Sequence, residues 1–283
     1  YGLRATFATV GFLFFDNKQQ LLASIPPQTP QYIQQNLSPY KGYIDKTAAL
    51  TQGDFYHYAY DLLQQIQQYP EQEIASHTFS HYYCLEKGQT LSDFEIDLQA
   101  AINIAKQRAI SLTSLVFPRN QYNDAYLKII ENKGFTAFRG NEKVWFHKPE
   151  SQSAESLVKR AFRLLDAYIN IGGHHCYSTQ KVAASKPFNM PASRFLRPYS
   201  SKLRHLETLR LRRIKKSMTH AAKKGLVYHL WWHPHNFGAN IDKNFAFLEK
   251  ILVHYQFLHH KYGFESLTMQ ALSKKIVTKN QHR

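Results

Sequence analysis

The sequence EIASHTFSH, residues 73–81, joins an apolar, strand-like run to a pair of histidines four positions apart, His77 and His81. On one helical turn, residues i and i+4 share a face, so both imidazoles could reach a single divalent ion without backbone strain. The spacing therefore predicts a metal site, with zinc as the expected ion. The alternative is an amphipathic helix on which both histidines are ordinary polar surface residues.

Polar residues also follow three later strand-like runs, at 114–117, 135–138 and 227–232. The first leads to Arg119 and Tyr122, and the other two end directly at Arg139 and at His233. In proteins with a parallel sheet, ligands and catalytic groups gather at the carboxyl ends of the strands. We therefore expect these segments and residues 73–81 to meet at one place, which we call the mouth.

The order of these motifs resembles the polysaccharide deacetylase family, carbohydrate esterase family four. RATFATVG at 4–11 is similar to that family's second strand, and HTFSH at 77–81 to its His-Ser/Thr-x-x-His metal motif. YGFESLT at 262–268 resembles its closing strand. The resemblance covers nearly the whole chain in the right order, and it is specific as a set although each motif is weak alone.

The site motifs carry the same resemblance. Arg119 and Tyr122 are similar to the family's Arg-x-x-Tyr segment, with Gln121 where the family usually has proline. His233 resembles the family's late histidine at a strand end. The resemblance implies that His77 and His81 hold the metal together with one carboxylate. It also implies removal of the acetyl group from an N-acetylated sugar in a bacterial surface polysaccharide or its precursor.

The implied chemistry gives further residues a role. His233 would protonate the departing amine, with His235 as the second candidate, and Arg119 would orient an aspartate base. A backbone N–H near Tyr122 would stabilise the oxyanion. Arg139, Trp232 and His174 are candidate substrate-binding residues, and Trp231 and Trp145 could also stack on a sugar. For His174, after the break at Gly172-Gly173, an ordinary surface loop is the alternative, and for Trp232 it is the aromatic core.

One departure from the family concerns its first strand, which ends in Thr-Phe-Asp-Asp and supplies the base and the third metal ligand. No Asp-Asp pair occurs in the 283 residues, and Asp16 follows the second strand. We expect the missing strand to lie upstream of Tyr1, so that the chain alone is inactive or weakly active. The alternative is that the motif was truly lost, leaving a glycan-binding relative without catalysis.

The implied fold is an α/β protein, a deformed (β/α) barrel forming a single domain over residues 1–283, with a loop-rich insertion at about 17–53. Strand-like and helix-like segments alternate along the chain, and a Ser-x-x-Glu capping box at Ser92 is expected to open one helix. The expected helices cover residues 55–68, 92–109, 123–133, 154–171, 202–224 and 241–262.

The chain carries 36 Lys and Arg against 20 Asp and Glu, a formal charge of +16, much of it on the expected helix at 202–224. This charge favours polyanions, an anionic membrane surface or a lipid-linked precursor. The alternative is that the basic side of the helix is an ordinary solvated face. Nucleic acid is not expected, since no recognised nucleic-acid module accompanies the charge. No apolar run approaches the ~18 residues of a membrane span. We therefore expect a cytoplasmic protein or one peripheral at the membrane.

Overall fold

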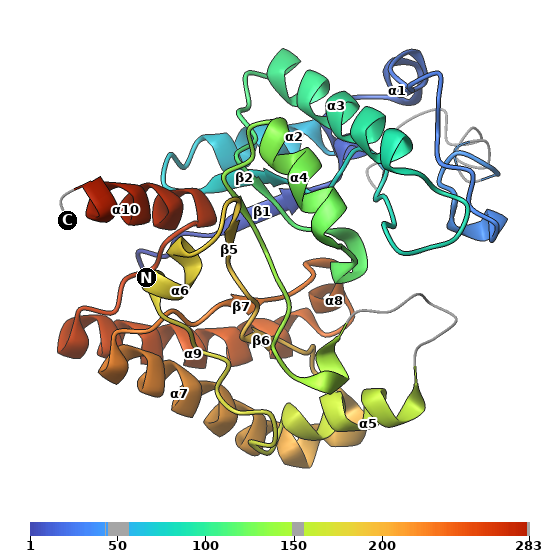
Figure 1. The fold of residues 1–283 in the computed structure, drawn as a ribbon. Coiled ribbons are helices and arrows are strands. Elements are labelled where there is room, and N and C mark those ends of the chain that lie inside the picture. The colour runs from blue at the N-terminus through green and yellow to red at the C-terminus, as the bar shows by residue number, and fades with distance from the viewer. Residues whose placement is uncertain (43, 45–56, 149–155, 282–283) are drawn as a thin grey trace.

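A parallel sheet of five strands, in the order β1-β2-β3-β4-β5, forms the centre of the computed structural model, which describes residues 1–42, 44, 57–148 and 156–281 (Figure 1). The strands are β1 (Thr6–Thr9), β2 (Glu73–Ser76), β3 (Ser114–Leu115), β4 (Ala137–Phe138) and β5 (Phe188–Asn189). Their pairing sets one row of neighbours, which is Thr9, Ser76, Leu115, Phe138 and Asn189. Because all five strands are parallel, the residues after this row lie at one edge of the sheet.

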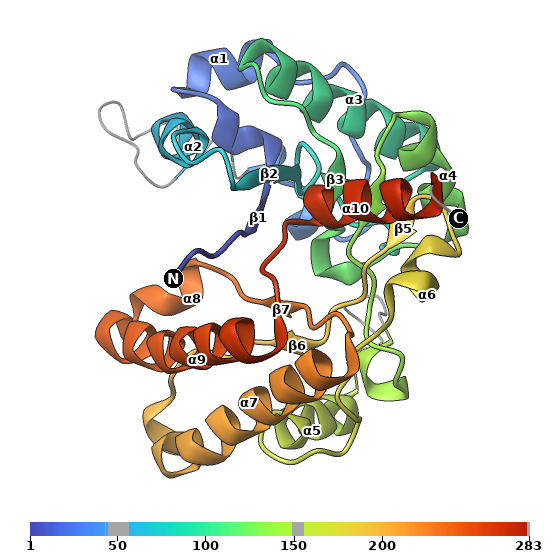
Figure 2. The same cartoon turned by 90° about the vertical axis from the view of Figure 1, so that its left-hand side faces the viewer.

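A second, two-stranded parallel sheet continues from the first. The chain of β5 runs on into β6 (Arg194–Phe195), which pairs with β7 (Leu230–Trp231). Backbone hydrogen bonds connect the two sheets where the chain passes from β5 to β6. The Ala192 N–H donates to the Gly140 carbonyl at 2.9 Å, and the Ser193 N–H donates to the His229 carbonyl at 2.9 Å. In Figure 2 the strands follow one another round an open arc from β1 to β7. The expected α/β class with a parallel sheet is thus confirmed.

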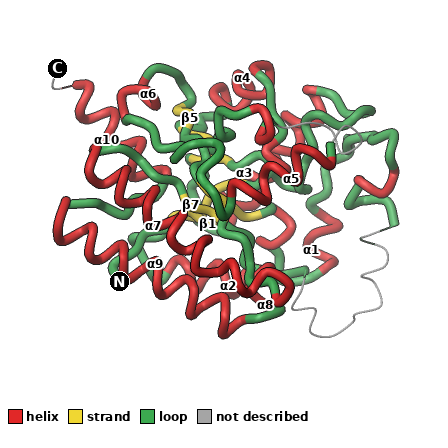
Figure 3. Tube along the Cα trace, turned by 90° about the horizontal axis from the view of Figure 1, so that it is seen from below, coloured by secondary structure: helices red, strands yellow, loops and turns green. Residues whose placement is uncertain are grey.

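Helices cover the outside of this arc (Figures 1 and 3). In Figure 1, α1 to α4 lie above the first strands, while α7 and α9 lie below β6 and β7. The helices are α1 (Lys18–Ala23), α2 (Tyr60–Gln67), α3 (Leu91–Gln107), α4 (Asp124–Asn132), α5 (Leu157–Asp166), α6 (Thr179–Ala183), α7 (Glu207–Lys224), α8 (His235–Gly238), α9 (Ile241–Tyr262) and α10 (Met269–Gln281). Within the described ranges, no helix has the length and apolar character needed to cross a membrane.

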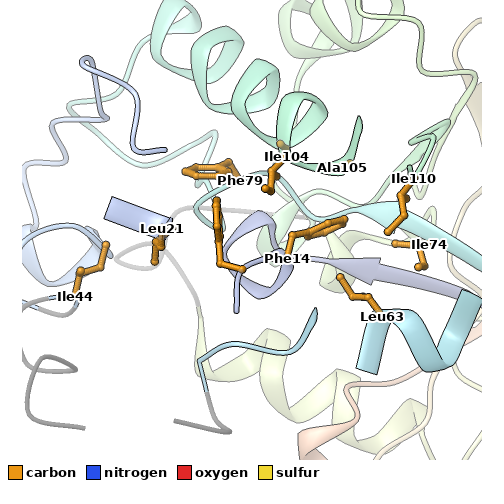
Figure 4. Packing of buried hydrophobic residues seen from close by; sticks show 11 residues of the cluster. Phe14, Leu21, Ile44, Leu63, Ile74, Phe79, Ile104, Ala105 and Ile110 are labelled. Carbon is orange, nitrogen blue, oxygen red and sulfur yellow. The ribbon is translucent and has the colours of Figure 1, made fainter. Parts of the chain in front are cut away.

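The core beside the mouth is built from β2, α3 and the first turn after β1. Phe14, Phe79 and Ile104 pack together there with aliphatic side chains from α2 and β2 (Figure 4). Gly11 permits this packing, because a Cβ at that position would lie 2.6 Å from the Phe79 ring. The loop that carries the two histidines is therefore packed into the core through Phe79.

Several expected boundaries differ from the structure. Thr90, not Ser92, caps α3, because Thr90 Oγ1 accepts from the Asp93 N–H at 3.1 Å while Asp93 Oδ2 accepts from the Thr90 N–H at 2.9 Å. The expected closing strand at 262–268 is wrong, since α9 runs to Tyr262, Gly263 caps it with a φ of 64°, and the following residues up to Thr268 form no strand.

Other expected segments extend beyond the described residues. The helix expected at 55–68 is described as α2, and the one expected at 154–171 as the shorter α5, while residues 55–56 and 154–155 lie outside the description. The expected insertion at about 17–53 contains α1 and a short 3₁₀ turn, Gln35–Leu37, with residues 43 and 45–53 outside the described part.

Candidate functional site

The loop between His77 and His81 brings the two rings together. It follows β2 directly and is not helical, since Thr78 and His81 have left-handed φ angles of 65° and 61°. The prediction of one helical turn is therefore wrong in its geometry. The ring centroids nevertheless lie 4.8 Å apart, with the planes inclined at 70°.

The buried carboxylate of Asp97, on α3, fixes this loop from behind. Asp97 accepts hydrogen bonds from the Phe79 N–H at 2.8 Å and the Ser80 N–H at 3.2 Å, and also from the Ser80 hydroxyl. Burial raises the pKa of Asp97 to about 7, against the lowering effect of these hydrogen bonds. The strained loop keeps its shape because these bonds and the buried Phe79 hold its middle in place.

Both histidines have one ring nitrogen engaged by protein oxygens. The Nδ1–H of His77 donates to the Val116 carbonyl at 2.7 Å, which leaves Nε2 with its lone pair, and Nδ1 of His81 lies 3.0 Å from the Tyr83 hydroxyl. Burial, with the neighbouring His81, holds the pKa of His77 well below its usual range. Burial, then the charges of Arg119 and His233, lower the pKa of His81 to about 4. Both rings are therefore neutral at pH 7 and able to ligate a cation.

Arg119 lies on the His81 side of the mouth. Its guanidinium stacks over the Tyr83 ring, 4.4 Å from the centroid, and Nη1 lies 3.7 Å from Oε1 of the buried Glu86. Gln121 donates to the same Glu86 oxygen at 2.9 Å. Arg119 has a φ of 51°, so the backbone itself turns sharply here to present the side chain.

Arg139 and His233 complete the opposite side. Arg139 follows β4, donates from Nη2 to Asn120 Oδ1 at 2.7 Å, and lies over the Trp231 ring, 4.0 Å from its centroid. Burial lowers the pKa of Arg139 to about 10. The ring of His233 lies 5.3 Å from that of Trp231 and stacks on His235 at 5.2 Å. Burial, then His235 and Arg139, lower the pKa of His233.

Tyr122 lies between Phe117 and Phe138, with ring centroids 5.3 Å and 5.2 Å away. Its phenol is hydrogen-bonded by the Asn141 backbone and the Asn189 side chain, while burial raises its pKa. Gly140 is needed for this arrangement, because a Cβ there would fall 2.0 Å from Asn189 Oδ1.

The remaining candidate substrate-binding residues lie elsewhere. Trp232 stacks on Phe237, 5.9 Å between centroids, and packs against the core cluster under α7 and α9. His174 contacts α7, where its ring stacks on His220 at 4.5 Å and its Nδ1 lies 3.0 Å from Ser217 Oγ. The structure therefore brings together His77, His81, Arg119, Arg139, His233 and His235, and it separates His174 and Trp232 from them by their packing.

The sequence analysis missed Asp97, which shapes the site. Asp97 lies four positions after Asp93, which is one helical turn further along α3. A second acid on the same face of the helix could have indicated that this side chain points inward. Trp231 contacts Arg139 and His233, and alternation along β7 places it on the opposite face from Trp232. The direction of that alternation was not readable from the sequence.

The His77–His81 pair fits part of a metal site. Catalytic zinc sites use three protein ligands with an open position, and these rings supply a pair of neutral nitrogen donors. Within residues 1–42, 44, 57–148 and 156–281, no group of three or more His, Cys, Asp or Glu side chains is placed to hold a metal. No protein-family model matches the chain, and no curated protein matches it.

Proposed function

We propose that the chain forms most of a metal-dependent carbohydrate deacetylase with a deformed (β/α) barrel. The observation that carries the proposal is the convergence of His77, His81, Arg139 and His233 from the carboxyl ends of separate parallel strands. These residues are far apart in sequence. Their side chains meet around a pair of neutral histidines, which is the kind of arrangement that could hold a metal ion and an amide substrate side by side.

His77 and His81 would hold a divalent cation, with zinc preferred by their imidazole nitrogens. When bound, such an ion lowers the pKa of water and polarises a carbonyl oxygen. The positive charges of Arg119 and Arg139 also repel a cation bound between the two histidines. Arg139 lowers the pKa of His77, and Arg119 lowers the pKa of His81. A carboxylate in the third position would offset them, which agrees with the ligand set implied by the resemblance.

The other residues of the mouth bind substrate and move protons. His233 carries an imidazole at the edge of the site, where a proton can be given to the departing sugar amine. Trp231, held between Arg139 and Phe195, presents an aromatic ring beside it, with the Phe195 centroid at 4.6 Å. An N-acetylated pyranose stacked there would bring its amide toward the histidine pair.

The proposed barrel closes through a strand between β1 and β7. In the described part of the chain, β1 is at one edge of its sheet and β7 at one edge of the other. A strand contributed from before Tyr1 and paired to β1 would end beside Thr9, whose carbonyl accepts from the His77 N–H at 2.9 Å. An Asp-Asp pair at that end would therefore reach His77, as base and third ligand.

The test compares two proteins: residues 1–283, and the same chain extended by joining a strand that ends in Asp-Asp before Tyr1. We expect zinc-dependent acetate release from N-acetylated oligosaccharides by the extended protein only. The control is the extended protein treated with a chelator and then resupplied with zinc.

Two outcomes would contradict the proposal. Extended protein that binds these oligosaccharides but releases no acetate from any of a broad panel would favour the glycan-binding alternative. Activity that survives His77→Ala with unchanged turnover would show that the metal site lies elsewhere.

A further inference from the structure

Helix α5 turns its apolar face to solvent. Leu157 is 75% exposed and Leu165 is 49% exposed, and Val158 and Ala161 on the same side are exposed as well. The opposite side carries Asp166, which is fully buried. A surface helix normally has the reverse arrangement, with apolar residues facing the core.

Buried ion pairs fix this orientation. Asp166 Oδ2 lies 2.5 Å from Arg194 Nη1, on β6, and Asp166 Oδ1 lies 3.4 Å from Arg213 Nη2, on α7. Asp166 Oδ1 also accepts from the Gly172 N–H at 2.8 Å. Rolling α5 to bury its leucines would break a buried charge network and leave charged groups buried without their partners, which is strongly destabilising. The apolar face is therefore held outward.

The exposed apolar surface continues beyond α5. Trp145, in the 3₁₀ turn Trp145–His147, is 54% exposed and packs edge-on against Phe162 of α5, with centroids 5.1 Å apart. Ile169 and Ile171, just after α5, are also exposed. Contiguous apolar surface of this kind marks an interaction site, and a tryptophan at its border is typical of the membrane interface.

The sequence around this surface has an excess of basic residues. Residues 143–171 hold five basic residues, Lys143, Lys148, Lys159, Arg160 and Arg163, against three acidic ones, Glu150, Glu155 and Asp166. Of the acids, Asp166 is buried and paired, and Glu150 and Glu155 lie outside the described residues. An apolar helix face bordered by Lys and Arg complements a bilayer with anionic headgroups.

We propose that α5 and the turn Trp145–His147 form a docking surface for an anionic lipid bilayer. The turn Trp145–His147 follows the carboxyl end of β4, the end that carries Arg139 of the mouth. Docking would thus turn this end of the sheet toward the headgroups. If the proposed function holds, the substrate is an N-acetylated glycan at the membrane surface, such as a lipid-linked precursor. The docking itself does not depend on that function.

The test is sedimentation of the protein with vesicles of phosphatidylglycerol and phosphatidylcholine, compared with phosphatidylcholine alone. We expect binding to the anionic vesicles, and at least a tenfold loss of affinity in Leu157→Glu/Leu165→Glu, because about 1–1.5 kcal/mol of apolar burial is lost at each site. Vesicles with bromine-labelled acyl chains should quench the tryptophan fluorescence of the parent, because Trp145 would enter the bilayer interface. Trp145→Phe should remove that quenching.

The matched control is Val253→Glu/Phe257→Glu on α9, which exposes similar apolar residues and also carries Asp242 and Glu249. This variant should bind vesicles like the parent. Equal loss in both variants, no binding by the parent, or binding unaffected by Leu157→Glu/Leu165→Glu would overturn the proposal. The proposal would also be overturned if the parent were a dimer that does not bind vesicles and Leu157→Glu/Leu165→Glu made it monomeric. That result would assign the surface to contact with a second copy of the chain. In the extended protein, acetate release from a soluble oligosaccharide should be unchanged by the docking variants, which separates this result from the proposed function.

Discussion

The Asp97 carboxylate accepts a hydrogen bond of 2.8 Å from the Phe79 N–H, halfway between the two histidines of the mouth. Asp97 belongs to α3, which is packed on β2, so the helix and the histidine loop form one unit. The loop contains left-handed residues at both Thr78 and His81, a conformation that costs free energy for residues with a Cβ. The bonds to Asp97 offset that cost, and the ring geometry of the pair depends on them.

Asp97→Asn should therefore destabilise the fold, and by an amount that depends on pH. A raised folded pKa means that the stability contributed by Asp97 is fully present below its unfolded pKa of about 4 and is lost as pH rises through about 7. The asparagine does not titrate. The difference in unfolding free energy between parent and variant should thus be larger at pH 5 than at pH 8, measured by urea denaturation. A difference that grows with pH would contradict this.

Asp97→Ala should cost more than the asparagine variant, since it leaves the Phe79 and Ser80 N–H groups without a buried acceptor. We expect about 2–4 kcal/mol, from about 1–3 kcal/mol for each buried group left unpaired. The matched control is Asp124→Ala, an exposed acid in the first turn of α4, which should cost well under 1 kcal/mol. Similar losses in the two variants would show that Asp97 has no special role.

Zinc binding should depend on both histidines of the loop. Removing a residue that merely orients a metal ligand costs about 10–100-fold in affinity, so His77→Ala or His81→Ala should cost at least that. His260→Ala, an exposed histidine near the end of α9, is the control and should leave zinc affinity unchanged. Elemental analysis after dialysis and a competition titration with a chelating dye give the comparison. Equal zinc content in all four proteins would refute the metal site.

The sequence predicted the parallel sheet and the strand ends well, because apolar runs followed by polar residues are a local signal. It did not predict the path between His77 and His81. Left-handed φ angles at Thr78 and His81 arise from distant contacts, with Asp97 on α3 and Phe79 in the core, which no spacing rule contains. The right pair of residues was thus found for a wrong geometric reason.

The choice between Trp231 and Trp232 failed for a related reason. Adjacent strand residues face opposite ways and both tryptophans are half-buried, but the sequence alone does not say which of them packs toward α7 and α9 and which toward the mouth. Likewise Asp166 could not be assigned from its helix, since its partners Arg194 and Arg213 follow much later in the chain.

His233 should act in proton transfer and not in metal binding. In the extended protein we expect His233→Ala to lower turnover by about 10²–10⁴-fold while zinc content stays unchanged, as for loss of a general acid. The alkaline limb of the pH–rate profile should disappear with it. His235→Ala, which removes the stacked neighbour, should have a smaller effect. A larger loss from His235→Ala would exchange the two roles, and loss of zinc in His233→Ala would make His233 a ligand.

The two tryptophans of β7 should separate binding from stability. Trp231→Leu removes the ring beside Arg139 and His233, so affinity for an N-acetylated oligosaccharide should fall about 2–10-fold, since aromatic stacking contributes about 0.5–1.5 kcal/mol. Trp232→Leu removes a ring packed on Phe237 in the core and should lower stability by about 1–3 kcal/mol with affinity retained. Calorimetric titration and thermal unfolding of both variants give the comparison. Loss of affinity in Trp232→Leu alone would restore the original choice of Trp232 as the substrate-binding residue and remove Trp231 from the site.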